Sequence, residues 1–166
     1  MLLIRVDKPR WEWNSDDSPW IPPGDIPAAP LTDLRTSPNS ELSVWYVEDN
    51  RTNLERIVAA LAGTRDHCDK FDFALFPEVV LTQAQIQSKN SMGNSADRDA
   101  NSSWHRDLVE LTASKLSTLA RLIREQGAIE RRFEKQVIEL IADGVKQGRI
   151  EALRLKPALR KNVLGS

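Results

Sequence analysis

The stretch from residue 41 to residue 76 constrains the fold most, because its pattern predicts a strand, a helix and a second strand in succession. Residues 42–47 (LSVWYV) are rich in β-branched and aromatic side chains, and both alternating sets carry bulk, which is typical of a strand covered on both faces. Residues 71–76 (FDFALF) form a second apolar run that ends at Pro77. Two strands joined by one helix are usually parallel, so we expect a β-α-β unit here.

The connecting helix has a predicted start, a predicted end and one apolar face. Thr52 and Glu55 have the spacing of a capping box, in which each side chain accepts a hydrogen bond from the backbone amide of the other residue. Gly63 is placed to end the helix in the left-handed conformation. The apolar face, which we expect to pack on the sheet, follows helical spacing. It consists of Leu54, Ile57, Val58 and Leu61.

The N-terminal part combines a short apolar run with a long segment rich in proline and tryptophan. Residues 2–6 (LLIRV) predict a strand that could join the same sheet. Residues 8–39 contain seven of the nine prolines, which disfavour a helix interior or a central strand, so we expect an irregular strap. Three tryptophans of the strap either plug the core or line a partner-binding patch. They are Trp11, Trp13 and Trp20.

The second half of the sequence is first polar and then helical in pattern. Residues 88–103 offer almost no apolar surface to bury, which predicts a mobile loop. Residues 104–126 and 129–147 each show apolar residues at helical spacing, with Gly127 and Gly148 as stops. Two amphipathic helices joined at one glycine predict an antiparallel hairpin.

Length and composition set the expected domain organisation. The chain of 166 residues has a formal net charge of −1 and one cysteine, Cys68, so we expect one cytoplasmic domain without an internal disulfide. No run approaches the ~20 apolar residues that would span a bilayer, and we expect no membrane partner. The predicted fold is α+β, with the sheet in residues 1–87, the loop in 88–103, the hairpin in 104–148 and a basic tail in 149–166.

The hairpin and the tail carry the candidate binding surfaces. The apolar stripe of the second helix includes Phe133, Val137 and Ile141, which would either pack within the chain or join a second copy in a homodimer. The tail interleaves basic and apolar residues, and its cations would either contact nucleic-acid phosphates or lie against acidic parts of the protein. The basic residues are Lys146, Arg149, Arg154, Lys156, Arg160 and Lys161.

Candidate catalytic groups are sparse. His67 and Cys68 are adjacent, whereas a nucleophile and its base normally come from separate segments. Asp107 and Glu110 would share a face of the predicted helix and could hold a divalent ion with a third ligand, although acidic residues are also favoured in a first helical turn. No pair of cysteines or histidines has zinc-ligand spacing, and the sequence contains no phosphate loop or nucleophile elbow.

These observations favour a non-catalytic protein-interaction or assembly module that forms homo-oligomers through its C-terminal helices and needs no cofactor or metal. The first alternative is a nucleic-acid-binding accessory subunit that uses the basic tail. The second alternative is a small metal-dependent hydrolase or nuclease that uses acidic residues such as Asp107 and Glu110.

Overall fold

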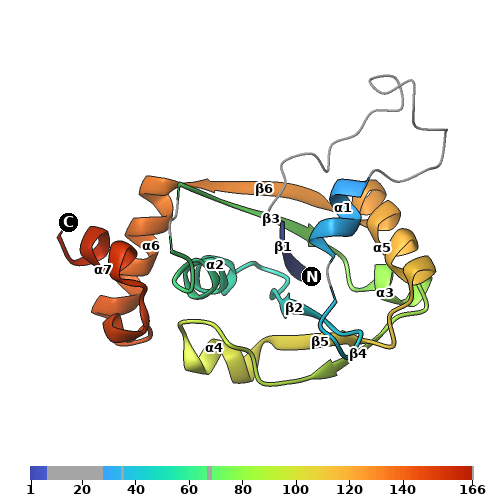
Figure 1. Ribbon diagram of the computed structural model, residues 1–166, viewed down its shortest axis with the longest axis horizontal. Helices are drawn as coiled ribbons and strands as arrows, with labels where there is room; N and C mark the ends of the chain where they lie inside the picture. The colour runs from blue at the N-terminus through green and yellow to red at the C-terminus, as the bar shows by residue number, and fades with distance from the viewer. Residues whose placement is uncertain (7–27, 35, 67–68, 166) are drawn as a thin grey trace. The chain divides into compact units, whose positions relative to one another are not determined.

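The computed structural model describes residues 1–6, 28–34, 36–66 and 69–165. Within these residues, six strands hydrogen-bond in the order β4-β5-β2-β1-β3-β6, and helices connect them (Figure 1), which confirms the predicted α+β class. The strands are β1 (Leu2–Val6), β2 (Leu42–Tyr46), β3 (Lys70–Phe76), β4 (Gln87–Asn90), β5 (His105–Val109) and β6 (Ala128–Phe133). The helices are α1 (Ala28–Asp33), α2 (Leu54–Ala62), α3 (Val79–Gln83), α4 (Arg98–Ser103), α5 (Ala113–Gln126), α6 (Glu134–Lys146), the 3₁₀ turn η1 (Ala152–Arg154) and α7 (Pro157–Leu164).

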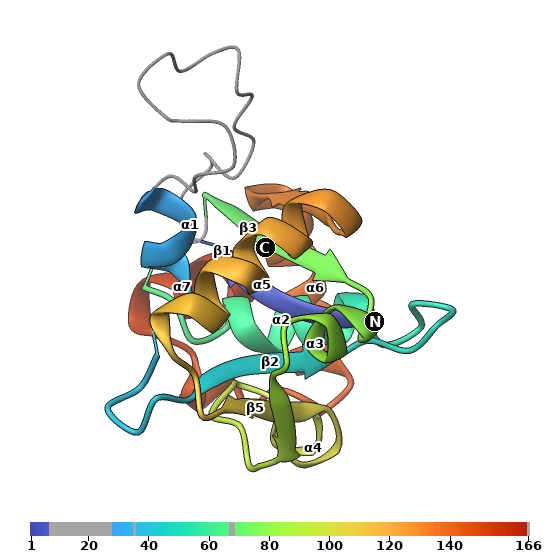
Figure 2. The same ribbon diagram turned by 90° about the vertical axis from the view of Figure 1, so that its right-hand side faces the viewer.

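The N-terminal strand β1 occupies the centre of the sheet. It pairs antiparallel with β3, with Ile4 opposite Ala74, and it lies between β2 and β3 (Figure 2). Every residue from Phe71 to Phe76 is buried, which explains why this run is apolar on both alternating faces. The predicted strands are therefore present, but the strands of the β-α-β unit are not direct neighbours, because β1 separates them.

The described residues cluster into two compact units, each built from three separate segments of the chain. Unit 1 contains residues 1–44, 72–89 and 107–130, and unit 2 contains residues 45–71, 90–106 and 131–166. In unit 1, α5 packs against α1 and α3. In unit 2, α6 packs against both α2 and α7, and α2 also contacts α4. Two pockets along α6 lie within unit 2.

Helix α2 is the buried helix of unit 2. Leu54, Ile57 and Val58 are buried as predicted, whereas Leu61 is only half-buried. Three alanines on other sides of the helix are also buried, so α2 is enclosed on more than one face and its small residues let neighbouring segments approach closely. These alanines are Ala59, Ala60 and Ala62.

The capping of α2 differs from the prediction at its start, whereas Gly63 ends the helix as predicted but in a different conformation. The helix begins after Asn53, and the Thr52 hydroxyl donates to Glu48 instead of closing a capping box with Glu55. Gly63 ends the helix in a right-handed conformation, with φ of −61°. A Cβ at Gly63 would lie 2.8 Å from the Cβ of Ala96, so the position requires glycine for close packing and not for backbone freedom.

The predicted direct helical hairpin is wrong, because each predicted helix begins as a strand. Residues 105–109 form β5, Glu110 adopts a left-handed conformation with φ of 55°, and α5 starts only at Ala113. Strand β6 then lies between α5 and α6. Gly148 follows α6 with φ of 71°, which confirms it as a stop.

The segment predicted to be a mobile loop instead contains β4 and α4. Its buried polar groups are satisfied internally: the Ser95 amide donates to the Asn101 side chain at 2.8 Å, and the Asn101 amide group donates back to the Ser95 carbonyl at 3.2 Å. The Ala96 amide donates to the Ala60 carbonyl at 2.9 Å. Hydrogen bonding to buried partners therefore orders a segment that has little apolar surface.

The predicted basic tail is also structured. Leu155, Leu159 and Val163 are buried in unit 2, and they anchor η1 and α7. Among the described helices, none combines the length and the apolar character that crossing a membrane requires.

Candidate functional site

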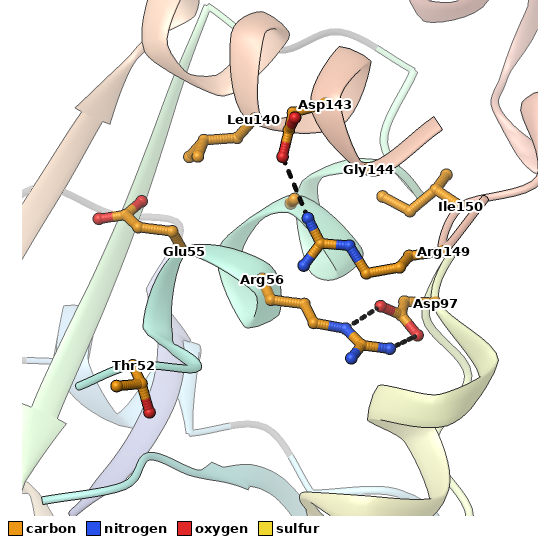
Figure 3. A pocket seen from close by; sticks show the side chains of 10 residues that line it. Thr52, Glu55, Arg56, Asp97, Leu140, Asp143, Gly144, Arg149 and Ile150 are labelled. Atoms are coloured by element: carbon orange, nitrogen blue, oxygen red, sulfur yellow. Dashed lines mark hydrogen bonds and ion pairs between the residues drawn. The ribbon is translucent and has the colours of Figure 1, made fainter. Parts of the chain in front are cut away.

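A small polar pocket lies where α2, the start of α4 and the end of α6 meet (Figure 3). Arg56 projects from α2, and its Nε and Nη2 atoms donate to the two carboxylate oxygens of Asp97 at 2.6 and 2.9 Å. Asp97 is the N-cap of α4, and its side chain is 1% exposed. The Arg56 guanidinium also lies 5.1 Å from the ring centroid of Trp104, in cation–π geometry.

The Arg56–Asp97 pair fixes the charge state of both groups. Burial raises the pKa of Asp97, but the hydrogen bonds from Arg56 and from the Ala100 amide, together with the Arg56 charge, outweigh burial and hold this pKa below its usual range. The hydrogen bond to Asp97 raises the pKa of Arg56 above its already high value. Both groups are therefore charged at neutral pH.

The other charged groups of the pocket are paired as well. Arg149 donates to Asp143 at 3.1 Å, and Glu55 accepts from Arg132 at 2.8 Å. The pocket holds about 130 Å³, which is the size of a few water molecules. Because every acidic and basic side chain that lines it has an opposite charge beside it, the pocket offers no uncompensated charge to an ionic ligand. Its chemistry is that of a structural junction between α2, α4 and α6.

The second candidate site is a shallow groove between α6 and α7, which we call the α6–α7 groove. It encloses about 600 Å³, and most of its exposed surface is apolar. Ile138, Ala142 and Val163 supply the apolar lining, and charged residues of α6 supply the rim. The rim residues are Glu134, Lys135 and Glu139.

The predicted partner-binding residues of α6 divide between surface and core. Phe133, directly before α6, is 63% exposed. Val137 and Ile141 are fully buried, which agrees with the alternative that this stripe packs within the chain: they form the face that holds α6 on unit 2. Ile138 and Ala142, which follow Val137 and Ile141 by one residue on the helix, were not predicted as contacts. Their helical spacing of four residues is the sequence signal that could have identified them. Trp11, Trp13 and Trp20 lie outside the described residues.

The predicted nucleic-acid contacts are also divided. Arg149 is paired with Asp143, Arg160 donates to the carbonyls of Leu153 and Leu155 at 2.9 Å each, and Lys156 lies 4.0 Å from Asp66. Arg149 and Arg160 therefore stabilise unit 2 itself, whereas Lys156 is exposed and its pair with the exposed Asp66 contributes little. The other three predicted residues are also exposed on the surface; they are Lys146, Arg154 and Lys161.

The candidate catalytic groups do not converge. Asp107 lies on β5, where it accepts a hydrogen bond from the Ser43 hydroxyl at 3.3 Å. Glu110 lies in the turn that follows. The prediction that the two residues share a helix face is therefore wrong. His105 is buried, with its Nδ1 atom 2.8 Å from the Ser91 hydroxyl. Among the residues that the structure describes, no three His, Cys, Asp or Glu side chains are grouped to hold a metal ion. His67 and Cys68 lie outside that part of the chain.

No protein-family model, no curated protein and no solved structure matches this chain.

Proposed function

We propose that this protein is a non-catalytic protein-interaction module that binds a helix of its partner in the α6–α7 groove. The observation that carries the proposal is the apolar lining of Ile138, Ala142 and Val163 with a charged rim around it. A groove between two helices accepts the apolar ridge of a third helix, with the rim charges setting its orientation.

The distribution of exposed apolar side chains supports this choice of surface. Within the described residues, Val79, Met92, Phe133, Leu153 and Leu164 are the large apolar side chains that are mostly exposed. Phe133 is the last residue of β6 and precedes α6 directly, and Leu164 is the last residue of α7, so two of the five lie at an end of a helix that forms the groove.

The electrostatics of the polar pocket support a structural role for its central ion pair. General acid–base catalysis requires groups whose pKa values lie near the working pH. The pKa of Asp97 is lowered and the pKa of Arg56 is raised, so both values move away from neutral pH. The pair therefore keeps its charges and acts as a fixed link between α2 and α4.

A matched pair of variants tests the proposed surface. Ala142→Glu places a charge in the groove, whereas Ala113→Glu places the same charge in the first turn of α5, which does not line the groove. Both variants and the wild type would be purified from the native cells under identical conditions, and their bound proteins compared by quantitative mass spectrometry. We expect Ala142→Glu to lose partners that Ala113→Glu retains. Retention of every partner by a folded Ala142→Glu variant would rule out the groove.

Nucleic-acid binding is the alternative proposal, and three exposed cations support it. Lys146, Arg154 and Lys161 would contact phosphates, and their replacement by glutamine would reduce the salt dependence of binding. A gel-shift titration at several salt concentrations measures that slope. Undetectable binding at low salt would eliminate this alternative.

A further inference from the structure

The rim of the α6–α7 groove carries one basic and two acidic residues, and two of them, Lys135 and Glu139, have opposite charges on one exposed face of α6. Lys135 and Glu139 lie one turn apart on α6, with side chains that are 89% and 64% exposed and charged atoms 4.0 Å apart. We propose that the groove is occupied by α6 of a second copy of this chain, which gives a dimer with two-fold symmetry. This inference rests on the proposed function, because it names the partner of the same groove.

The charge pattern fits an antiparallel pair of α6 helices. If the two-fold axis passes near residue 137, Lys135 of each copy faces Glu139 of the other, because the two positions are equally far from the axis. Two ion pairs then form across the interface, and a two-fold operation always produces such pairs twice. An exposed ion pair within one helix contributes little to stability, so exchanging it for a pair across the interface costs little.

The same alignment brings apolar residues together. Ile138 lies one residue from the axis, so it meets Ile138 of the second copy. Residue 133 lies level with residue 141 of the other helix, so the exposed Phe133 comes to the end of α6 that carries Ala142 in that copy. In the antiparallel arrangement the N-terminus of each α6 lies beside the C-terminus of the other, so the opposite ends of the two helix dipoles are neighbours. Each copy thus covers apolar surface that the isolated chain leaves open to water.

Charge reversal tests this dimer without knowledge of any other partner. Lys135→Glu leaves an acidic residue at both position 135 and position 139, and Glu139→Lys leaves a basic residue at both. We expect each single variant to dimerise at least about tenfold more weakly than the wild type, because like charges then face each other across the interface. An equimolar mixture of the two variants should restore dimers, since every facing pair is again of opposite sign. Sedimentation-velocity ultracentrifugation measures the dissociation constants.

A control pair separates effects within one helix from effects between copies. Arg121 and Glu125 form the same kind of exposed pair on α5, with a distance of 2.9 Å. Arg121→Glu and Glu125→Arg should leave the dissociation constant unchanged. Circular dichroism would check that all four variants remain folded.

The outcomes distinguish this inference from the proposed function. A wild-type chain that stays monomeric up to millimolar concentration overturns the dimer, as does a dimer that neither single reversal weakens. In both cases, loss of another protein partner in Ala142→Glu would still support the groove as a binding surface. Weakened single variants with a restored mixture support the dimer directly.

Discussion

Arg56 and Asp97 form a two-point ion pair that joins the first turn of α2 to the N-cap residue of α4. The same carboxylate accepts a hydrogen bond from the Ala100 amide at 3.0 Å, so it also caps α4. The buried carboxylate of Asp97 therefore pairs with the Arg56 guanidinium and caps the N-terminus of α4 at the same time.

We expect Asp97→Ala to lower the free energy of unfolding by about 3–5 kcal/mol, because it leaves a partly buried guanidinium without its main partner. Asp97→Asn should cost less, since asparagine can still cap α4. Urea denaturation measures both. Asp99 is the control: its side chain is 84% exposed and lies 3.4 Å from Arg56, so Asp99→Ala should cost no more than about 1 kcal/mol.

The lowered pKa of Asp97 predicts how stability depends on pH. Folding favours the charged carboxylate, so its contribution is complete above the pKa of an unfolded aspartate, about 3.9, and is lost as the pH falls through the lower folded value. The stability difference between wild type and Asp97→Asn should stay constant above about pH 5 and shrink in more acidic solution. Urea titrations at several pH values check this. A difference that grows on acidification would contradict the assigned direction.

The contact between Gly63 and Ala96 predicts a compensating pair of mutations. Gly63→Ala should destabilise the protein by about 1–3 kcal/mol, because the new methyl group would meet Ala96 in a packed interior. Adding Ala96→Gly should recover part of that loss by removing the opposing methyl group. Thermal unfolding of the two single variants and the double variant measures the coupling. A stabilising Gly63→Ala would show that the contact tolerates the methyl group.

Burial along α2 predicts unequal costs for two similar truncations. Ile57 is fully buried, so Ile57→Ala should cost about 2–5 kcal/mol. Leu61 is only half-buried, so Leu61→Ala should cost clearly less. Equal losses in urea denaturation would mean that Leu61 packs more tightly than its exposure indicates.

Strands with apolar residues on both faces could be predicted from the sequence, as could the helix that follows Asn53. Strand β5 could not, because His105 to Val109 carries several polar residues and Leu108 fits the helical spacing of the residues after it. Strand β6 reads Ala-Ile-Glu-Arg-Arg-Phe, which is equally compatible with a helix. In both cases, pairing with a strand that is distant in the sequence decides the conformation over local preference.

The candidate groove was predicted only in outline. The sequence indicated α6 as an interaction element and Phe133 as a contact. It could not distinguish Ile141 from Ala142, because both are apolar neighbours and only the position of α2 decides which one is buried. The Arg56–Asp97 pair was missed because 41 residues separate its members.

The backbone passes from one unit to the other after residues 44, 71, 89, 106 and 130. No single proteolytic cut or gene truncation can therefore release either unit whole. During synthesis, the second unit has to wait for its last segment, which begins at residue 131, to leave the ribosome before α2 can be covered by α6. Such late closure of distant segments predicts slow folding and a nascent chain that needs protection from aggregation until this segment has emerged.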